Sequence, residues 1–261
     1  MVIKLMNKLG ISINQTNVEM IPAYAAAGFE VMEISLPNKP HEELVAFGER
    51  ALELAKECGM QLWSVHVPFG RSLEISSVEE AKRLNVLSML MPSIALAKKW
   101  GAQVLVVHAS SEPNEPSSRP ARILACAESL KTLQRAAAPV RVALENLPRT
   151  CIGRESCEVV PLAKYCSGIC FDVNHLLIES HEDFMKEAAP FIITTHLSDY
   201  DGEDEKHWMP GAGVVPWKQV YDTLTAAGYE GPWLFELGRN PDGTNFDPVA
   251  VLDSWARESG L

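Results

Sequence analysis

The stretch VRVALENLPRTCIGRESCEVVPLAKYCSGICFDVNH, residues 140–175, contains the pattern that decides the fold. Two apolar runs, residues 140–146 and 168–173, flank a segment with helical periodicity, residues 155–166. Continuous apolar runs rich in Val and Ile are typical of parallel strands that are covered on both faces. The stretch therefore predicts one strand–helix–strand unit of a parallel sheet.

The same alternation of strand and helix runs along the whole chain. The other strands are expected at residues 8–14, 31–36, 62–68, 103–109, 191–199 and 232–238, and the other helices at residues 17–28, 42–58, 78–99, 119–137, 181–189, 217–227 and 248–258. Gly59 and Gly101 stand where a helix should yield to the next strand, as left-handed C-caps do. The length of 261 residues also matches the roughly 250 residues of a (β/α)8 barrel. We therefore expect an α/β fold with one domain, residues 1–261, closed as a TIM barrel.

The composition and the net charge limit the kinds of molecule that the protein is expected to bind. The chain is 47% hydrophobic and 22% charged, as in an ordinary globular protein. Its formal net charge of -11 argues against a broad basic surface for nucleic acid or for an anionic membrane. We expect a small polar molecule as the partner, with no nucleic acid and no membrane, and leave a homo-oligomer open.

Two further features bear on the compartment. The first residues, MVIKLMNKLG, show no long apolar segment after the lysines, which argues against a signal peptide or a membrane anchor. The six cysteines include no C-x-x-C pair and are expected to be buried, reduced thiols. Both features predict a cytoplasmic protein.

Acidic and histidine residues stand at or near the ends of the predicted strands. A charge in an apolar environment is costly unless it is paired, and the carboxyl ends of barrel strands share one rim. We therefore expect convergence on one polar site. The residues concerned are Glu33, His66, His108, Glu145, Asp172, His196 and Glu236.

Four of these residues come from consecutive strands. The fifth to eighth predicted strands carry, at their ends, Glu145, Asp172, His196 and Glu236. Three carboxylates and one imidazole suit a single divalent ion such as Mn, Mg, Co or Zn. The alternative is that each is a lone polar residue satisfied by a neighbouring loop, and the occurrence of all four in succession favours the metal site.

Several short motifs carry a family resemblance. They are ALENLPR at residues 143–149, D-x-x-H from Asp172 to His175, H-L-x-D from His196 to Asp199 and H-x-x-P-G-x-G from His207 to Gly213. With these motifs the chain resembles the xylose isomerase-like TIM barrel family of sugar and sugar phosphate isomerases and epimerases. It resembles endonuclease IV more distantly. The resemblance covers nearly the whole chain.

The resemblance implies that Glu145, Asp172, His196 and Glu236 are the metal ligands. It also implies that Glu145 and Glu236 form the acid–base pair of a metal-dependent sugar isomerase or epimerase. In such a reaction a proton leaves the carbon next to a carbonyl, and the cation stabilises the enediolate that forms. His175, three residues beyond Asp172, is expected to bind a substrate oxygen and take part in catalysis.

Two other activities stay open at this point. A keto-sugar or inositol dehydratase or lyase would use the same enolisation. An endonuclease IV-like zinc phosphodiesterase acting on abasic DNA would need a second or third zinc. The extra ligands would be His66, His108, His175, His207 and Glu205, where the nuclease class has aspartate in place of Glu205. The short loops expected after the first two strands, residues 15–16 and 37–43, leave little room to grip a duplex.

The substrate is less readable from the sequence. His66 and His108 are alternatively expected to bind substrate hydroxyls. Arg149, together with the loop at residues 211–213, is a candidate for a phosphate group, and Trp217 is a candidate apolar wall beneath a sugar ring. Whether the sugar is phosphorylated is left open. Glu33 is among the weakest candidates, since it lies inside its apolar run, where it could point into the barrel mouth or pair with a lysine.

Overall fold

Eight parallel strands form the centre of the molecule. The computed structural model describes residues 7–261. Neighbouring strands pair in the order β7-β6-β5-β4-β3-β2-β1-β8. The strands are β1 (Leu9–Ile13), β2 (Val31–Ser35), β3 (Gln61–His66), β4 (Val104–Val107), β5 (Arg141–Glu145), β6 (Gly168–Asp172), β7 (Ile192–His196) and β8 (Trp233–Phe235).

The sheet closes into a barrel between β7 and β8, the two ends of this order. Beyond the end of β7, Leu197 forms a parallel bridge with Phe235 of β8. The Leu197 amide donates to the Leu234 carbonyl at 2.8 Å, and the Glu236 amide donates to the Leu197 carbonyl at 3.1 Å. These bonds complete a barrel, so the predicted TIM barrel is confirmed.

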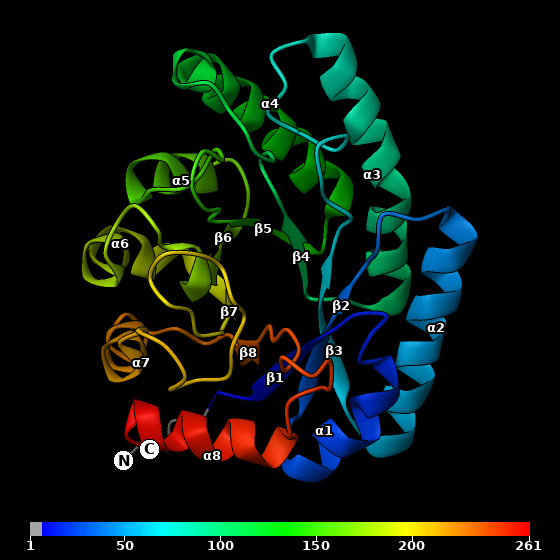
Figure 1. Cartoon of the computed structure of the whole chain (residues 1–261). Helices are drawn as coiled ribbons and strands as arrows, with labels where there is room; N and C mark the ends of the chain where they lie inside the picture. The colour runs from blue at the N-terminus through cyan, green and yellow to red at the C-terminus, as the bar shows by residue number, and fades with distance from the viewer. Residues whose placement is uncertain (1–6) are drawn as a thin grey trace.

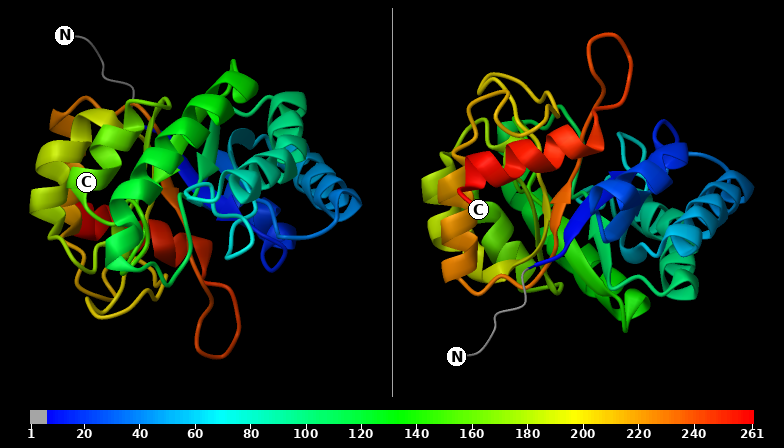
Figure 2. Two further views of the ribbon diagram at one scale, coloured as in Figure 1. Left: turned by 90° about the horizontal axis from the view of Figure 1, so that it is seen from above. Right: turned by 90° about the horizontal axis from the view of Figure 1, so that it is seen from below.

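Eight helices surround the barrel (Figure 1). They lie outside the strands in the views from above and below as well, where the segment between β8 and α8 projects from the molecule (Figure 2). Gly59 and Gly101 follow α2 and α3 with φ of 81° and 77°, as predicted for C-caps. The helices are α1 (Ile21–Ala27), α2 (His41–Cys58), α3 (Glu80–Trp100), α4 (Arg119–Ala137), α5 (Ser156–Ala163), α6 (His181–Ala188), α7 (Trp217–Ala226) and α8 (Pro248–Ser259). None of the helices among residues 7–261 is long and apolar enough to cross a membrane.

The interior of the barrel changes character along its axis. Small apolar side chains, Val104, Val106, Ala143 and Cys170, form a buried cluster of their own. Alternate residues of a strand share a face, so Glu145 and Asp172 lie one layer above Ala143 and Cys170. The apolar cluster therefore closes the barrel from below and leaves a polar layer at the carboxyl ends of the strands.

Candidate metal centre at the mouth of the barrel

The polar residues that the sequence singled out do converge. His66, Glu145, Asp172 and His196 are the last residues of β3, β5, β6 and β7, while His108 and Glu236 directly follow β4 and β8. All except His108 and Glu236 are almost completely buried. Because all strand ends point to one rim, these side chains meet at the mouth. His66, His108, Glu145 and Glu236 line a hollow of about 230 Å³ there, whereas Asp172 and His196 are buried and do not line it.

A group of four lies at the centre of this mouth. One ligand atom from each of Glu145, Asp172, His196 and Glu236 lies within 4.8 Å of the others. The His196 Nδ1 atom is 3.4 Å from Glu145 Oε1 and 3.2 Å from Glu236 Oε2. The arrangement brings together the four residues that the sequence predicted as ligands.

Two atoms of this group are buried without a hydrogen-bond partner. Among residues 7–261, Asp172 Oδ2 and His196 Nδ1 belong to the few buried side-chain atoms with none. Buried polar atoms are rarely left unpaired, because the loss of solvation costs about 1–3 kcal/mol for each. The chemistry of the set, three carboxylates and one imidazole, suits a divalent cation that would satisfy both atoms. The residues present therefore fit the ion that the sequence implied.

Glu33 holds His196 from the opposite side. Its carboxylate accepts hydrogen bonds from His196 Nε2 at 3.0 Å, Ser12 Oγ at 3.1 Å and Ser64 Oγ at 2.7 Å. A carboxylate on one ring nitrogen fixes the tautomer that presents the other nitrogen to a metal. Glu33, a weak candidate in the sequence, therefore holds His196 in place rather than facing the mouth.

Asn146 plays a comparable part for Asp172 and His175, and sequence reasoning did not single it out. Its amide donates to the Asp172 carbonyl at 2.9 Å and accepts from the Asp172 amide at 2.8 Å. Its own carbonyl lies 2.9 Å from His175 Nδ1. The only signal in the sequence is its place directly after Glu145. These bonds tie the ends of β5 and β6 together beneath the site.

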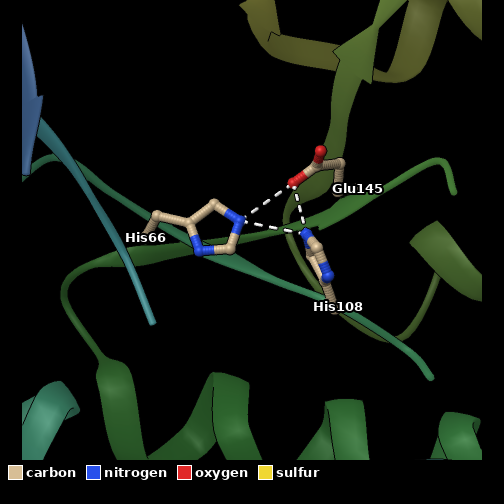
Figure 3. Close-up of side chains that lie close together, drawn as sticks. All are labelled: His66, His108 and Glu145. Atoms are coloured by element: carbon tan, nitrogen blue, oxygen red, sulfur yellow. Dashed lines mark hydrogen bonds and ion pairs between the residues drawn. The ribbon is translucent and has the colours of Figure 1, made fainter. Parts of the chain in front are cut away.

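A second group lies beside the first one (Figure 3). Both His66 Nε2 and His108 Nε2 lie 3.0 Å from Glu145 Oε2 and 3.1 Å from each other. Figure 3 shows both rings directed at one carboxylate oxygen. The Phe69 ring packs on both imidazoles, with ring centroids 5.2 Å from His66 and 4.4 Å from His108. Glu145 thus belongs to both groups.

A third group stands on the outer side of the mouth. It consists of His175, Glu205 and His207, whose ligand atoms lie within 4.8 Å of one another. The backbone of His207 has a φ of 51°, a left-handed conformation that is uncommon outside glycine. Glu205, one methylene longer than aspartate, nevertheless reaches the two histidines. All the residues expected as ligands of further metals are therefore present in clusters.

The ionisation of the groups follows from their surroundings. Burial opposes charge on Glu145 and on His196, but their mutual attraction prevails. The His108 and His196 imidazoles hold the Glu145 pKa well below its usual range, and Cys170 and the carboxylates around His196 raise the pKa of that imidazole. Burial raises the pKa of Asp172 to about 6. A proton on His196 therefore balances part of the negative charge.

The two substrate candidates have different surroundings. Arg149 lines the mouth, where its guanidinium pairs with Glu112 at 2.9 Å, with Glu205 at 2.9 Å and with Asp204. Trp217 is buried and donates from Nε1 to Asp199 Oδ2 at 3.0 Å. It packs on the ring of Trp255, away from the residues that line the mouth. The expectation that Trp217 lies beneath a sugar ring is therefore not met by its position.

The comparisons with known proteins agree with this architecture. The family described as Xylose isomerase-like TIM barrel matches residues 21–254. An uncharacterized protein of Methanocaldococcus jannaschii is 26% identical over 182 residues, which cover 64% of this chain and 61% of the relative. The match thus spans less than two thirds of that curated relative.

Solved structures share the fold over nearly the whole chain. A D-tagatose 3-epimerase-like protein has a TM-score of 0.80 and 22% identity, covering 97% of this chain and 98% of its own. The 3-keto-D-glucoside 4-epimerase of E. coli has a TM-score of 0.75 and 20% identity, with coverages of 98% and 100%. The D-psicose 3-epimerase of Clostridium cellulolyticum H10 has a TM-score of 0.74 and 19% identity, with coverages of 97% and 95%.

Proposed function

The chain belongs to the xylose isomerase-like TIM barrel family, and from that premise we propose that it is a divalent-metal-dependent sugar isomerase or epimerase. The observation that carries the proposal is the approach of Glu145 and Glu236 to within 3.4 Å and 3.2 Å of His196 Nδ1, together with a buried Asp172 Oδ2 that has no hydrogen-bond partner. Three similar structures described as sugar epimerases or epimerase-like support the choice of substrate class.

The ion would be held by Glu145, Asp172, His196 and Glu236. When bound, a divalent cation supplies a Lewis acid that polarises a carbonyl and neutralises negative charge that develops on its oxygen. The supporting residues Glu33 and Asn146 keep the ligands in place. We propose Mn, Mg, Co or Zn as the ion, since mixed oxygen and nitrogen ligands suit each of them.

The two glutamates have the properties of a proton-transfer pair. The pKa of Glu236, like that of Glu145, is lowered: burial opposes this shift, but the His196 charge outweighs it. Both carboxylates are therefore ionised, which is the form that accepts a proton from carbon, and the lowered pKa makes each a weaker base than a free glutamate. The Glu236 side chain is 26% exposed and that of Glu145 is 1% exposed. Glu236 can thus exchange its proton with solvent, whereas Glu145 is shielded.

His175 is placed to bind a substrate oxygen. Its Nε2 atom is 3.5 Å from Asp172 Oδ2, and its Nδ1 atom is fixed by the Asn146 carbonyl. The carboxylates around it raise its pKa against the effect of burial. A protonated imidazole at this position would donate a hydrogen bond to an oxygen that becomes negative as the proton leaves carbon.

Solvent exchange tests the proposal directly. Protein supplied with Mn²⁺ or Co²⁺ in D₂O should introduce deuterium next to the carbonyl of at least one ketose, observed by proton NMR. Glu145→Gln and Glu236→Gln should each slow this exchange by about 10²–10⁴-fold, the usual contribution of a proton-transfer residue. Glu230→Gln, at the opposite end of the barrel, is the matched control. Absence of exchange with every ketose and keto-sugar of a broad panel would contradict the proposal.

Product analysis separates the neighbouring activities. Epimerisation or isomerisation conserves the composition of the sugar, whereas a dehydratase or lyase acting on a keto-sugar or inositol releases water or breaks a carbon bond. A product that is lighter than the substrate by one water molecule would show that the protein is a dehydratase. The same pair of glutamates would serve either reaction.

A zinc phosphodiesterase is a second candidate, favoured by one specific observation. Two further clusters, His66–His108–Glu145 and His175–Glu205–His207, flank the central group. A phosphodiesterase with two or three zinc ions would use such neighbouring sites to clamp the attacking and leaving oxygens. The formal net charge of -11 works against a DNA substrate. Native mass spectrometry should count about one ion for the isomerase and two or three zincs for this candidate, with cleavage of an abasic duplex as its activity test.

A further inference from the structure

A second hollow lies next to the mouth, over the ends of β1 and β2. Its volume is about 290 Å³, and it is lined by residues 14–16 and 35–38 and by Phe69. Phe69 also lines the mouth hollow of about 230 Å³. The two hollows therefore meet at one aromatic ring, which is 49% exposed.

The register of the sheet places this second hollow within reach of the reacting centre. Ser35, the last residue of β2, pairs with His66 of β3. Asn14 directly follows β1, the neighbour of β8, after which Glu236 stands. We call the residues that line this second hollow, 14–16 and 35–38, the β1–β2 sector. The sector adjoins the three clusters of the mouth on both sides, yet it contributes no residue to them.

The lining of this sector is polar and uncharged. It offers amide and hydroxyl side chains from Asn14, Gln15, Thr16, Ser35 and Asn38. The side chains of Gln15 and Asn38 are exposed and that of Ser35 is half-buried, so their donors and acceptors are accessible to a ligand. Hydroxyl groups of a sugar, each both donor and acceptor, match such side chains. The exposed Phe69 ring offers an apolar surface for the C–H face of a sugar ring.

Two of the groups that could hold a phosphate, Arg149 and the loop at residues 211–213, are already engaged with carboxylates of the protein itself. Arg149 pairs with Glu112, Asp204 and Glu205. In the loop expected to bind phosphate, residues 211–213, the Gly211 amide donates to Asp199 at 2.9 Å, and the Val215 amide just beyond it donates to the same carboxylate at 3.1 Å. One further arginine, Arg239, donates to the Thr16 carbonyl at 3.3 Å, at the edge of the β1–β2 sector.

We propose that the substrate is an uncharged sugar of more than one ring. Its reacting unit occupies the mouth, and its second unit occupies the β1–β2 sector with Phe69 between them. Each hollow alone lies at or below the small end of the ~300–1,000 Å³ typical of small-molecule sites, whereas the joined hollows reach that range. This inference rests on the proposed function, because the reacting unit is taken to be the sugar that is isomerised or epimerised.

Binding to a protein that cannot turn over the ligand tests the inference. The probes are D-fructose, D-fructose 6-phosphate and the neutral disaccharide ketoses turanose, maltulose, leucrose, isomaltulose and lactulose. The disaccharides share a fructose unit; the first four differ in the fructose hydroxyl that carries glucose, and lactulose carries galactose instead. Dissociation constants are measured by NMR titration on the Glu236→Gln protein. At least one disaccharide should bind about tenfold or more tighter than D-fructose, which corresponds to one or two neutral hydrogen bonds and a stacked ring. The 6-phosphate should bind no tighter than D-fructose.

Variants of the sector locate the effect. On the Glu236→Gln background, Asn38→Ala should bring the ratio of the D-fructose dissociation constant to the disaccharide dissociation constant close to one. Phe69→Ala on the same background should have the same effect. Asn85→Ala, an exposed asparagine on α3, is the control for the first change, and Leu124→Ala, an exposed apolar residue on α4, is the control for the second. Both controls should keep the ratio of the parent.

Three results would overturn the inference. One is that no disaccharide binds more tightly than D-fructose, or that no disaccharide binds at all. Another is tighter binding of the 6-phosphate that is lost in Arg239→Ala. A third is a disaccharide preference that survives Asn38→Ala and Phe69→Ala. Failure of the proposed function is visible separately, as absence of deuterium exchange in the unmodified protein.

Discussion

Glu33 shows how one residue can control the centre without facing it. It lies in the middle of β2, is completely buried, and accepts hydrogen bonds from β1, β3 and β7 through Ser12, Ser64 and His196. The bond to His196 Nε2 leaves Nδ1 directed at the carboxylates. The proposed metal site would therefore depend on the position and charge of a residue one layer below it.

Replacement of Glu33 should weaken metal binding. Glu33→Gln removes the charge behind His196 and should lower the affinity for Zn²⁺ or Mn²⁺ by about 10–100-fold, the usual effect of losing such a support. Competition with a chelating dye measures the affinity. Glu30→Gln, an exposed glutamate just before the same strand, should stay at the affinity of the parent. An affinity of Glu33→Gln within twofold of the parent would refute this role.

Metal binding should release protons from His196 and Asp172, so the metal affinity should depend on pH. The raised pKa of His196 means that the metal-free protein carries a proton there, and the pKa of Asp172 is raised to about 6 by burial. A metal needs both groups deprotonated, so affinity should rise with pH, and the Asp172 proton should add to the number released as pH falls toward 6. Calorimetry in buffers of different ionisation enthalpy counts these protons. An affinity that stays constant from pH 5.5 to 7.5 would contradict this.

At the level of elements, the long loop between β7 and α7 is organised by one buried carboxylate. Asp199 accepts from the amides of Tyr200, Gly211 and Val215 and from the Trp217 indole. Its backbone also pairs with Trp208, the neighbour of His207. The loop therefore presents Glu205 and His207 to the third group from a scaffold that is anchored at Asp199.

Removal of this anchor should affect the third group selectively. Asp199→Ala leaves several buried donors unpaired and should lower the free energy of unfolding by about 1–3 kcal/mol or more. If further metals are present, it should release the outermost one and leave the central ion in place. Denaturant unfolding and native mass spectrometry measure the two effects. Unchanged stability, or loss of the central ion with retention of the outer one, would contradict this anchoring.

The elements themselves could largely be predicted from the sequence, because apolar runs and helical periodicity are local. The ends of the strands predicted which four residues meet in the central group, since parallel strands of a barrel share one rim. Contacts between distant segments could not be read in this way. Trp217 is buried against Trp255 on α8, and Arg149 is paired by two other loops, so neither shows its environment in its own stretch of sequence. The role of Glu33 depends on three strands at once.

At the scale of the whole molecule, the mouth concentrates negative charge in a chain that is already acidic. Carboxylates brought together inside a barrel repel one another, and protons on the histidines offset this only in part. A divalent cation that binds the folded state should therefore stabilise the whole barrel.

Loss of the metal should lower thermal stability. Binding at about 100 times the dissociation constant contributes about 2.7 kcal/mol, which corresponds to a rise in Tm of roughly 5–10 °C for a domain of this size. Differential scanning fluorimetry with and without chelator measures the shift. Asp172→Asn should abolish most of it, whereas Asp222→Asn, an exposed residue on α7, should keep it. An equal shift in both variants would show that the metal acts elsewhere.

The most direct measurement is anomalous diffraction from crystals soaked with Mn²⁺ or Zn²⁺. The account predicts a peak at the mouth with one oxygen or nitrogen atom each from Glu145, Asp172, His196 and Glu236 at about 2.0–2.3 Å. A well-ordered mouth without a peak, or a peak that lacks contact with two or more of these four residues, would contradict the shared metal site on which the proposed chemistry depends.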